Sequence, residues 1–180
     1  MDFNQAITTR RSIREYTNQE VTKKQIEKLI ESAIIAPSWK NSQTARYHII
    51  TSDTLKEQFR ESCLGAYNGT NCKNAPVIIV TTFVSNRSGF ERDGTPSNEL
   101  VHNEWGFYDL GLHNQNFLLA ATNEGLSTLV MGIRDEAKIR QLLNIDENEI
   151  ICSVIALGYS NASPTKPKRK EVESITTFYE

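Results

Sequence analysis

The run Pro-Val-Ile-Ile-Val-Thr-Thr-Phe-Val at residues 76–84 most constrains how this chain can fold. It is almost continuously apolar and rich in β-branched residues, which is typical of a central strand covered on both faces. Pro76 stands at its first position, where the missing N–H does not interrupt the hydrogen-bond ladder. Further strands are predicted over 46–51, 127–131 and 150–159. The chain is therefore expected to build a sheet around this run.

Helical patterns alternate irregularly with these strands. Thr22-x-x-Gln25 is a capping box flanked by Val21 and Ile26, and the apolar spacing after it predicts a helix ending near Ala36. Other helices are predicted over 2–8, from Ser52 or Asp53 to about 63, over 99–124, and from Asp135 to about 143. The irregular order of strands and helices predicts an α+β or mixed α/β class.

The remaining segments carry weaker signals. Residues 64–74 are predicted to be turn-like, and 85–98 forms a long polar loop of the kind that is often a lid or disordered. Gly106 and Gly111 would let another backbone, such as that of a second subunit, approach the long helix closely. Ile175, Phe178 and Tyr179 near the chain end predict a tail that docks.

Composition excludes several classes of protein. The 180 residues suit one domain, 1–180, with 38% hydrophobic residues, no stretch long enough to span a membrane and no signal peptide, so a cytoplasmic protein is expected. Three cysteines without metal-ligand spacing predict thiols rather than a metal site. The net charge of -2 argues against a nucleic-acid-binding protein.

Two basic clusters lie far apart in the sequence. Arg10, Arg11, Ser12 and Arg14 form the first, and residues 166–170 form the second, with Lys166 and Lys168. Arginine can bind phosphate with two parallel hydrogen bonds, and serine adds a hydroxyl. The first cluster alone would suit a solvated helix end. If the fold brings the clusters together, they predict a pocket for a phosphorylated ligand.

A second polar stretch follows the capped helix at residues 36–43. It contains Pro37, Ser38, Trp39 and Asn41. Hydroxyl and amide groups beside a large flat ring suit a planar heterocyclic ligand. A polar turn with Trp39 packed in the core is an equal alternative.

In order and spacing, these stretches resemble the FMN-dependent nitroreductase family over nearly the whole chain. The motifs are Arg10-Arg11-Ser12-Ile13-Arg14 with Tyr16, Ala36-Pro37-Ser38 with Asn41 and Gln43, Asn74-Ala75-Pro76, Asp109 with Asn116, Gly125-Leu126 leading to Gly132, Ala156-Leu157-Gly158-Tyr159, and Lys166-Pro167-Lys168-Arg169. The resemblance implies a nitroreductase-like mixed β-sheet wrapped by helices. It also implies an intertwined homodimer with FMN at two interface sites.

The resemblance also implies a role for each matching residue. Arg10, Arg11 and Ser12 would hold the FMN phosphate and ribityl chain with Lys166 and Lys168, while Arg14 and Asn68 would face the pyrimidine edge. Met131 and Gly132 would present backbone beside the reactive ring nitrogen. The second subunit would contribute Pro37, Ser38, Trp39 and Asn41.

The implied activity is hydride transfer from NADH or NADPH through FMN to a nitroaromatic, a quinone or another small electrophile. No catalytic side chain is then expected, because the chemistry belongs to the flavin. A flavin-binding redox sensor or FMN carrier is the alternative. The sequence departs from the family pattern at Thr44, where many relatives have proline and then tryptophan, and at Lys168, where arginine is common.

Overall fold

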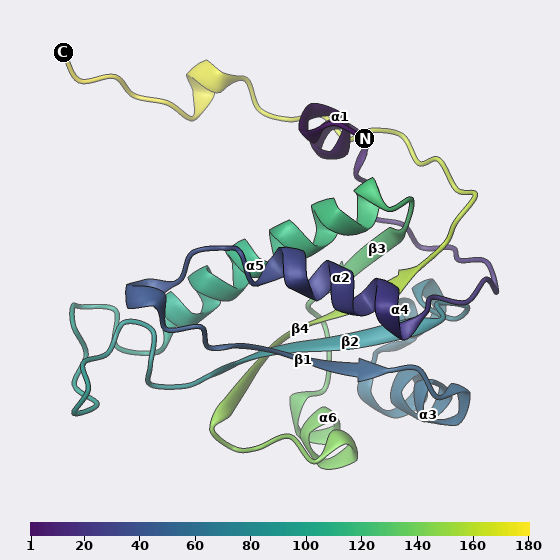
Figure 1. Cartoon of the computed structure of the whole chain (residues 1–180), viewed down its shortest axis with the longest axis horizontal. Helices are drawn as coiled ribbons and strands as arrows, with labels where there is room; N and C mark the ends of the chain where they lie inside the picture. Colours follow the sequence, from purple (N-terminus) through teal and green to yellow (C-terminus); the bar gives the residue numbers. More distant parts are fainter.

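Four strands form one sheet in the order β1-β2-β4-β3 in the computed structural model, which describes residues 1–180 (Figure 1). They are β1 (Ala45–Ile50), β2 (Val77–Val84), β3 (Ser127–Met131) and β4 (Glu149–Gly158). All residues of β2 except Val84 are buried. The prediction of a central strand covered on both faces is therefore confirmed.

Neighbouring strands pair antiparallel throughout the sheet. Val80 lies opposite His48 of β1 and Val154 of β4. A bulge between Thr81 and Thr82 shifts the register with β4. The one parallel pairing is an isolated bridge from Ser12 to Thr128 of β3, so the mixed character of the sheet is confined to this bridge.

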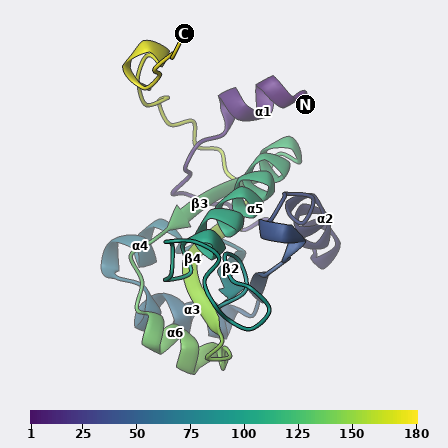
Figure 2. The same cartoon turned by 90° about the vertical axis from the view of Figure 1, so that its left-hand side faces the viewer.

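Helices cover both faces of the sheet, which confirms the α+β class (Figures 1 and 2). Helices α2 (Lys23–Ala33) and α5 (Glu104–Asn123) cover one face, and α3 (Asp53–Cys63) and α6 (Glu136–Leu143) cover the other. The shorter elements are α1 (Phe3–Thr9), η1 (Trp39–Asn41), α4 (Ala66–Asn71) and η2 (Val172–Ser174). Two apolar clusters result, one on each side of β2.

The predicted helix ends are largely confirmed. The Thr22 side chain accepts a hydrogen bond from the Gln25 N–H, and the Gln25 side chain accepts one from the Thr22 N–H. Ser52 and Asp135 cap α3 and α6 with their side chains. Gly125 ends α5 with a φ of 73°, a conformation that glycine adopts without strain.

Two predicted boundaries are wrong. The turn-like stretch at 64–74 contains α4, because Arg60 of α3 donates a hydrogen bond to the Gly69 carbonyl and holds the short helix in place. Helix α5 begins at Glu104 rather than 99. Asn103 has a left-handed backbone (φ 68°) and accepts a hydrogen bond from the Asn86 N–H, which ties residues 99–103 to the preceding loop.

The long loop at 85–98 is packed on the protein. Phe90 pairs with Pro96 in an isolated bridge, and both Phe90 and Ser88 are buried. A Cβ added at Gly89 would lie 2.7 Å from the Trp105 ring, so the loop approaches α5 very closely. Of the two predicted alternatives, the loop therefore resembles a docked lid.

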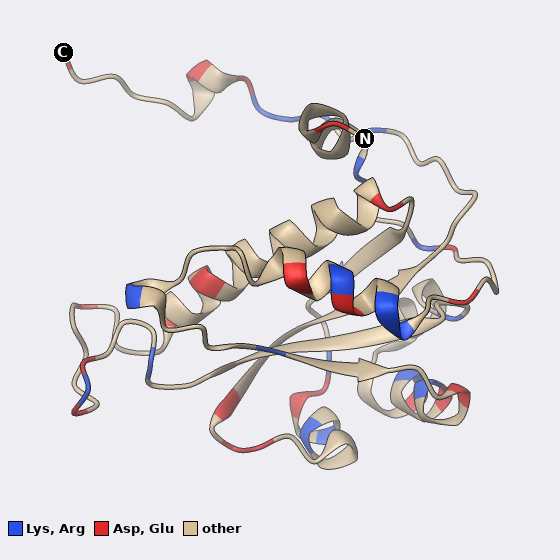
Figure 3. Cartoon of the chain, in the orientation of Figure 1, with Lys and Arg blue, Asp and Glu red and all other residues tan.

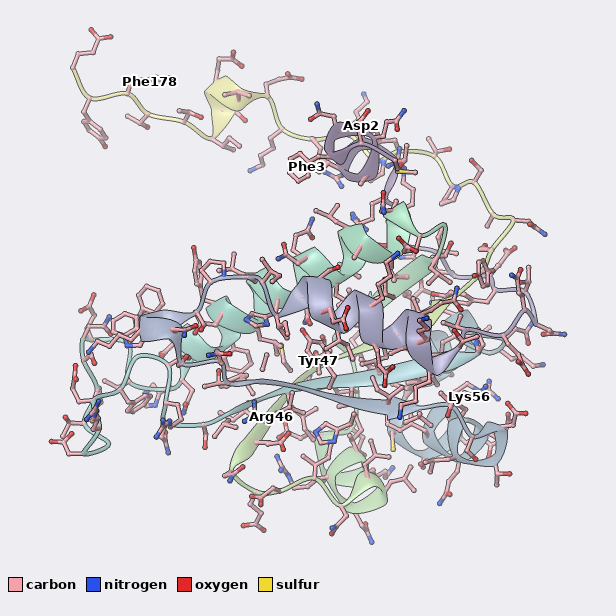
Figure 4. The ribbon with its side chains drawn as sticks, in the orientation of Figure 1. Asp2, Phe3, Arg46, Tyr47, Lys56 and Phe178 are labelled. Carbon is pink, nitrogen blue, oxygen red and sulfur yellow. The ribbon has the colours of Figure 1, made fainter.

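The tail makes no docking contact on its own chain, so the predicted docking does not take place within one chain. It leaves β4 and passes α1 on the side of the molecule away from α3 and α6 (Figure 1). Phe178 is 82% exposed, and Figure 4 shows it far from the sheet and from the helices that cover the sheet. Phe3 of α1 is also exposed, since Ala6 is the one buried residue of that helix. Both ends of the chain therefore present apolar side chains to solvent.

The two glycines of α5 differ in their surroundings. A Cβ at Gly106 would lie 2.2 Å from the Phe83 ring, so the close approach at this position is made within the chain. No atom lies within 4 Å of a Cβ at Gly111, which is open to a partner. No helix combines the length and apolarity needed to cross a bilayer.

Candidate functional site

The segment carrying the first basic cluster lies along the edge of β3. Ser12 forms its parallel bridge with Thr128, and the Ile13 N–H donates to the Thr128 carbonyl at 3.0 Å. Ile13 is buried, and the Tyr16 hydroxyl donates to its carbonyl at 2.9 Å. Because the pairing is parallel, the chain runs from Ser12 to Arg14 in the same direction as β3 runs toward Met131.

The arginines of this segment have no acidic partner. None of the ion pairs in the chain includes Arg10, Arg11 or Arg14. Arg11 donates to the carbonyls of Thr8 and Arg10 at 2.8 Å, and Arg14 donates to the Ser12 carbonyl at 3.3 Å. Since a guanidinium has five N–H donors, most donors remain open to an anion.

The second basic cluster lies on the same side of the molecule. Figures 1 and 2 both show the tail passing α1, and Figure 3 marks its basic residues beside that helix. Lys166 and Lys168 are exposed. Side-chain hydrogen bonds here run from Arg169 to the carbonyls of Pro167 and Lys168, within the tail itself. The fold thus gathers the two clusters on one side without a direct bond between them.

The residues predicted beside the flavin ring meet at the end of β3. Met131 is buried, whereas Gly132 is exposed and a Cβ there would have no neighbour within 4 Å. The Asn68 side chain of α4 donates to the Ile133 carbonyl at 2.9 Å. The structure therefore places Asn68 beside the backbone that follows Gly132.

The other predicted residues lie at the opposite end of the molecule. Element η1 lies by the start of α5, toward the left of Figure 1, whereas α1 lies beyond the other end of that helix. Pro37 and Asn41 are exposed, while Ser38 and Trp39 are half-buried. Within one chain, these residues do not meet the arginine segment.

The Trp39 side chain is half-buried and packs against another aromatic ring instead of lying in the core. Its ring lies 4.7 Å from that of Trp105, centroid to centroid, and Trp105 meets Tyr108 edge to face at 5.5 Å. Lys40 forms an ion pair with Glu91 of the docked loop at 2.9 Å. An aromatic surface thus adjoins the loop that carries Ser38 and Asn41.

A buried carboxylate on α5 holds this loop through hydrogen bonds. Asp109 of α5 is 3% exposed, and one of its oxygens accepts hydrogen bonds from the Trp39 N–H at 2.9 Å and the Ser88 hydroxyl at 2.6 Å. The Ser42 hydroxyl contacts the same oxygen at 3.5 Å. Asp109 belongs to one of the family motifs, but its sequence context predicted no role for it. The available signal was an acidic residue on the buried side of a largely apolar helix.

The backbone of the same loop is strained. Lys40, Asn41 and Gln43 have φ values of 44°, 55° and 50°. For residues other than glycine, this left-handed conformation costs roughly 1–2 kcal/mol each, and less for asparagine. Strain of this kind persists where the surrounding structure enforces it, and it clusters at functional sites.

The sequence profile of the Nitroreductase family matches residues 7–71 and 65–159, which together cover most of the chain. This chain belongs to the nitroreductase family. A Methanothermobacter thermautotrophicus protein, provisionally described as an NADH dehydrogenase/NAD(P)H nitroreductase, is 33% identical over 168 residues, covering 91% of this chain and 80% of that protein. Family membership identifies the chain as an oxidoreductase.

Solved structures show the same fold. A nitroreductase family protein from Streptococcus pneumoniae superimposes with a TM-score of 0.84 at 20% identity, covering 99% of this chain and all of the other. A Desulfovibrio desulfuricans nitroreductase family structure in complex with FMN has a TM-score of 0.78 at 26% identity, covering 97% of this chain and 95% of the other. The expected nitroreductase-like fold is confirmed.

A large pocket of the chain lies outside the residues predicted to bind FMN. It has a volume of about 560 Å³ and is lined by Lys56 and Arg60 of α3, by Lys73, and by other mostly polar residues of the 18–21, 51–57 and 74–76 segments. Only two of its twelve lining residues are hydrophobic. A flat heterocyclic ring needs apolar walls, so this pocket does not suit a flavin. No group of acidic, histidine or cysteine side chains is arranged to hold a metal ion.

Proposed function

We propose that this chain is an FMN-dependent oxidoreductase. It takes a hydride from NADH or NADPH onto bound flavin and reduces a nitroaromatic, a quinone or a similar small electrophile. The proposal rests chiefly on one observation: the Arg10–Arg14 segment is seated on β3 with its guanidinium groups free of acidic partners and leads toward Gly132. FMN binding by the Desulfovibrio desulfuricans neighbour supports the choice of cofactor.

The residues of this side suit the phosphate of FMN. A phosphate monoester carries nearly two negative charges at neutral pH. Arg10, Arg11 and Ser12 would bind it from the β3 edge, and Lys166 and Lys168 would bind it from the tail. Each hydrogen bond to a charged group contributes roughly 1.5–3 kcal/mol, so several of them together would retain the cofactor tightly.

The same edge of β3 also suits the flavin ring of FMN. Arg14 and Asn68 would donate to the pyrimidine edge, and the backbone of Met131 and Gly132 would lie beside the reactive nitrogen. The open space beside Gly132 leaves room for a flat ring. When bound, FMN supplies the hydride acceptance and donation. Arg14 would stabilise the negative charge that reduction places at the pyrimidine edge, which favours the reduced cofactor.

The site would be completed by a second copy of the chain. Pro37, Ser38, Trp39 and Asn41 lie at the end of the molecule opposite the arginine segment, so one chain supplies only part of the enclosure. An intertwined homodimer would bring the 37–41 loop of one subunit to the β3 edge of the other. The exposed face of α5 at Gly111 would lie in that interface. Obligate interfaces of this type bury roughly 2,000–5,000 Å².

The decisive test is a visible absorption spectrum of protein purified with added FMN, recorded anaerobically before and after NADH or NADPH. A flavin spectrum that bleaches, and recovers when a nitroaromatic or quinone is added, is the expected result. Protein that neither binds FMN nor oxidises NAD(P)H would refute the proposal.

A redox sensor or FMN carrier is the second candidate. The observation that favours it is the docked 85–98 loop, whose Glu91 pairs with Lys40 beside Trp39. In the proposed homodimer, this loop would narrow access to the ring site of the other subunit. Stopped-flow mixing separates the candidates. Rapid bleaching followed by fast reoxidation with an electrophile supports the enzyme, whereas bound flavin that NAD(P)H does not reduce supports the sensor or carrier.

A further inference from the structure

The loop at 38–43 is held by a small set of hydrogen bonds, most of which converge on Asp109 of α5. The Gln43 N–H donates to the Ser38 hydroxyl at 3.1 Å and closes the loop on itself. Asp109 then fixes the closed loop to α5 through the Trp39 N–H. The backbone N–H of Trp39 lies between Ser38 and Asn41, so its position governs both.

Asp109 also joins this loop to the docked 85–98 loop. Ser88 donates to Asp109, and the Ser42 and Ser88 hydroxyls lie 2.7 Å apart. No lysine or arginine forms an ion pair with Asp109 in the chain. The carboxylate is therefore stabilised by these hydrogen-bond donors, and the donors in turn are held by the carboxylate.

The hydrogen bonds to Asp109 form an anchor that opposes the strain in the backbone of the 38–43 loop. Lys40, Asn41 and Gln43 each have a positive φ, and without an external tether they would relax to commoner conformations. The Lys40–Glu91 ion pair is exposed, and pairs of that kind contribute little. The hydrogen bonds to buried Asp109 are thus the main polar restraint on the loop.

We propose that Asp109 is a positioning residue that holds Ser38 and Asn41 in the conformation in which they meet the flavin bound at the partner subunit. This inference rests on the proposed function. Asp109 would not touch the cofactor. It would act through the Trp39 N–H and Ser88, so its loss should release the strained loop and weaken FMN binding in the dimer.

The test compares Asp109→Ala, which removes the acceptor, with Asp109→Asn, which keeps an oxygen but loses the charge. Glu91→Gln is the matched control, because it breaks the exposed contact to the same loop. FMN affinity, measured by flavin fluorescence, should fall at least tenfold in Asp109→Ala and less in Asp109→Asn. It should stay within twofold of wild type in Glu91→Gln.

A second readout does not depend on the flavin. Lys40 is exposed, so trypsin cleavage after it in FMN-free protein reports release of the loop. We expect cleavage at least tenfold faster in Asp109→Ala than in wild type. Far-UV circular dichroism checks that each variant is folded. If Asp109→Ala is not folded, the comparison is made with Asp109→Asn instead.

A rescue variant separates positioning from general stability. Gln43→Gly removes the strain at one positive-φ residue, and the exposed Gln43 side chain makes no hydrogen bond. Added to Asp109→Ala, it should recover at least threefold of the lost FMN affinity. Unchanged affinity and cleavage in Asp109→Ala, or no recovery with Gln43→Gly, would overturn the inference. Wild-type protein that binds no FMN would instead refute the proposed function, while the trypsin comparison would still test the anchor.

Discussion

The Arg10 guanidinium makes no hydrogen bond or ion pair within the chain, although its backbone N–H caps the end of α1. A charged side chain without an internal partner contributes little to folding. The neighbouring Arg11 bonds only to backbone carbonyls. At the scale of single residues, these arginines are thus available for a ligand.

Replacing Arg10 by glutamine should therefore separate binding from stability. We expect the free energy of unfolding to change by less than about 0.5 kcal/mol. FMN affinity should fall about tenfold or more, because one hydrogen bond to a charged group is lost. Equilibrium urea unfolding and flavin fluorescence measure the two quantities. Arg92→Gln, an exposed arginine of the docked loop, is the control and should change neither.

His113 predicts a dependence of stability on pH. Burial lowers its pKa, and the nearby charge of Asp109 raises it by less. The unfolded chain, with a histidine pKa of about 6.5, therefore binds a proton before the folded chain does. The free energy of unfolding should fall as the pH drops below about 6.5, and stability should be retained above it.

Urea unfolding at pH 7.5 and pH 5.0 checks this expectation. His113→Gln should show a smaller fall between the two pH values than wild type, whereas replacing the exposed His102 by glutamine should leave the fall unchanged. Equal falls in wild type and His113→Gln would assign the pH dependence to other groups.

At the scale of elements, α5 performs two tasks on two faces. Its buried face carries Phe117, which stacks on Tyr47 of β1 at 6.1 Å, and Asp109, which holds the 38–43 loop. Its open face includes Gly111, Phe107 and Tyr108. A helix with apolar residues on an open face is expected to meet a partner.

The two glycines of α5 give a matched pair of substitutions. Gly106→Ala should destabilise the chain by roughly 1–3 kcal/mol, because the new methyl group would overlap the Phe83 ring. Gly111→Ala meets open space and should favour the helix by about 1 kcal/mol, but it should weaken the dimer. Urea unfolding and sedimentation velocity measure these effects. Similar destabilisation by both substitutions would contradict the distinction.

At the scale of the whole molecule, both chain ends project from the body. Helix α1 and the tail lie beyond β3 and α5, and the apolar side chains of Ile175, Phe178 and Tyr179 face solvent (Figures 1 and 4). The tail also carries Lys166 and Lys168. Such an arm has no folding role within one chain, which favours contacts with a second copy.

Truncating the chain after Ala162 removes the projecting tail and so tests its role in dimer formation and FMN binding. Light scattering should show more monomer than for the full chain, and FMN affinity should fall. The control is the full-length double variant Lys166→Gln/Lys168→Gln, which should remain dimeric but bind FMN more weakly. A truncated chain that is fully dimeric with unchanged affinity would exclude a role for the arm in either property.

Local sequence determined the strands, the capped helices and the presence of an unusual basic segment. The Thr22–Gln25 box and the 76–84 run depend on residues near one another in the chain, so their signals could be recognised directly. The order and spacing of short motifs also indicated the family. Helix α4 and the start of α5 were missed because contacts from Arg60 and Asn86 define them.

Tertiary structure alone decided how the candidate site is arranged. The bond from Ile13 to Thr128, which places the arginine segment on β3, joins residues that lie far apart in the sequence. The role of Asp109 likewise depends on three segments that meet only after folding. Spacing in the sequence specifies neither an edge pairing nor a convergence of hydrogen bonds, because both depend on how the helices and strands pack.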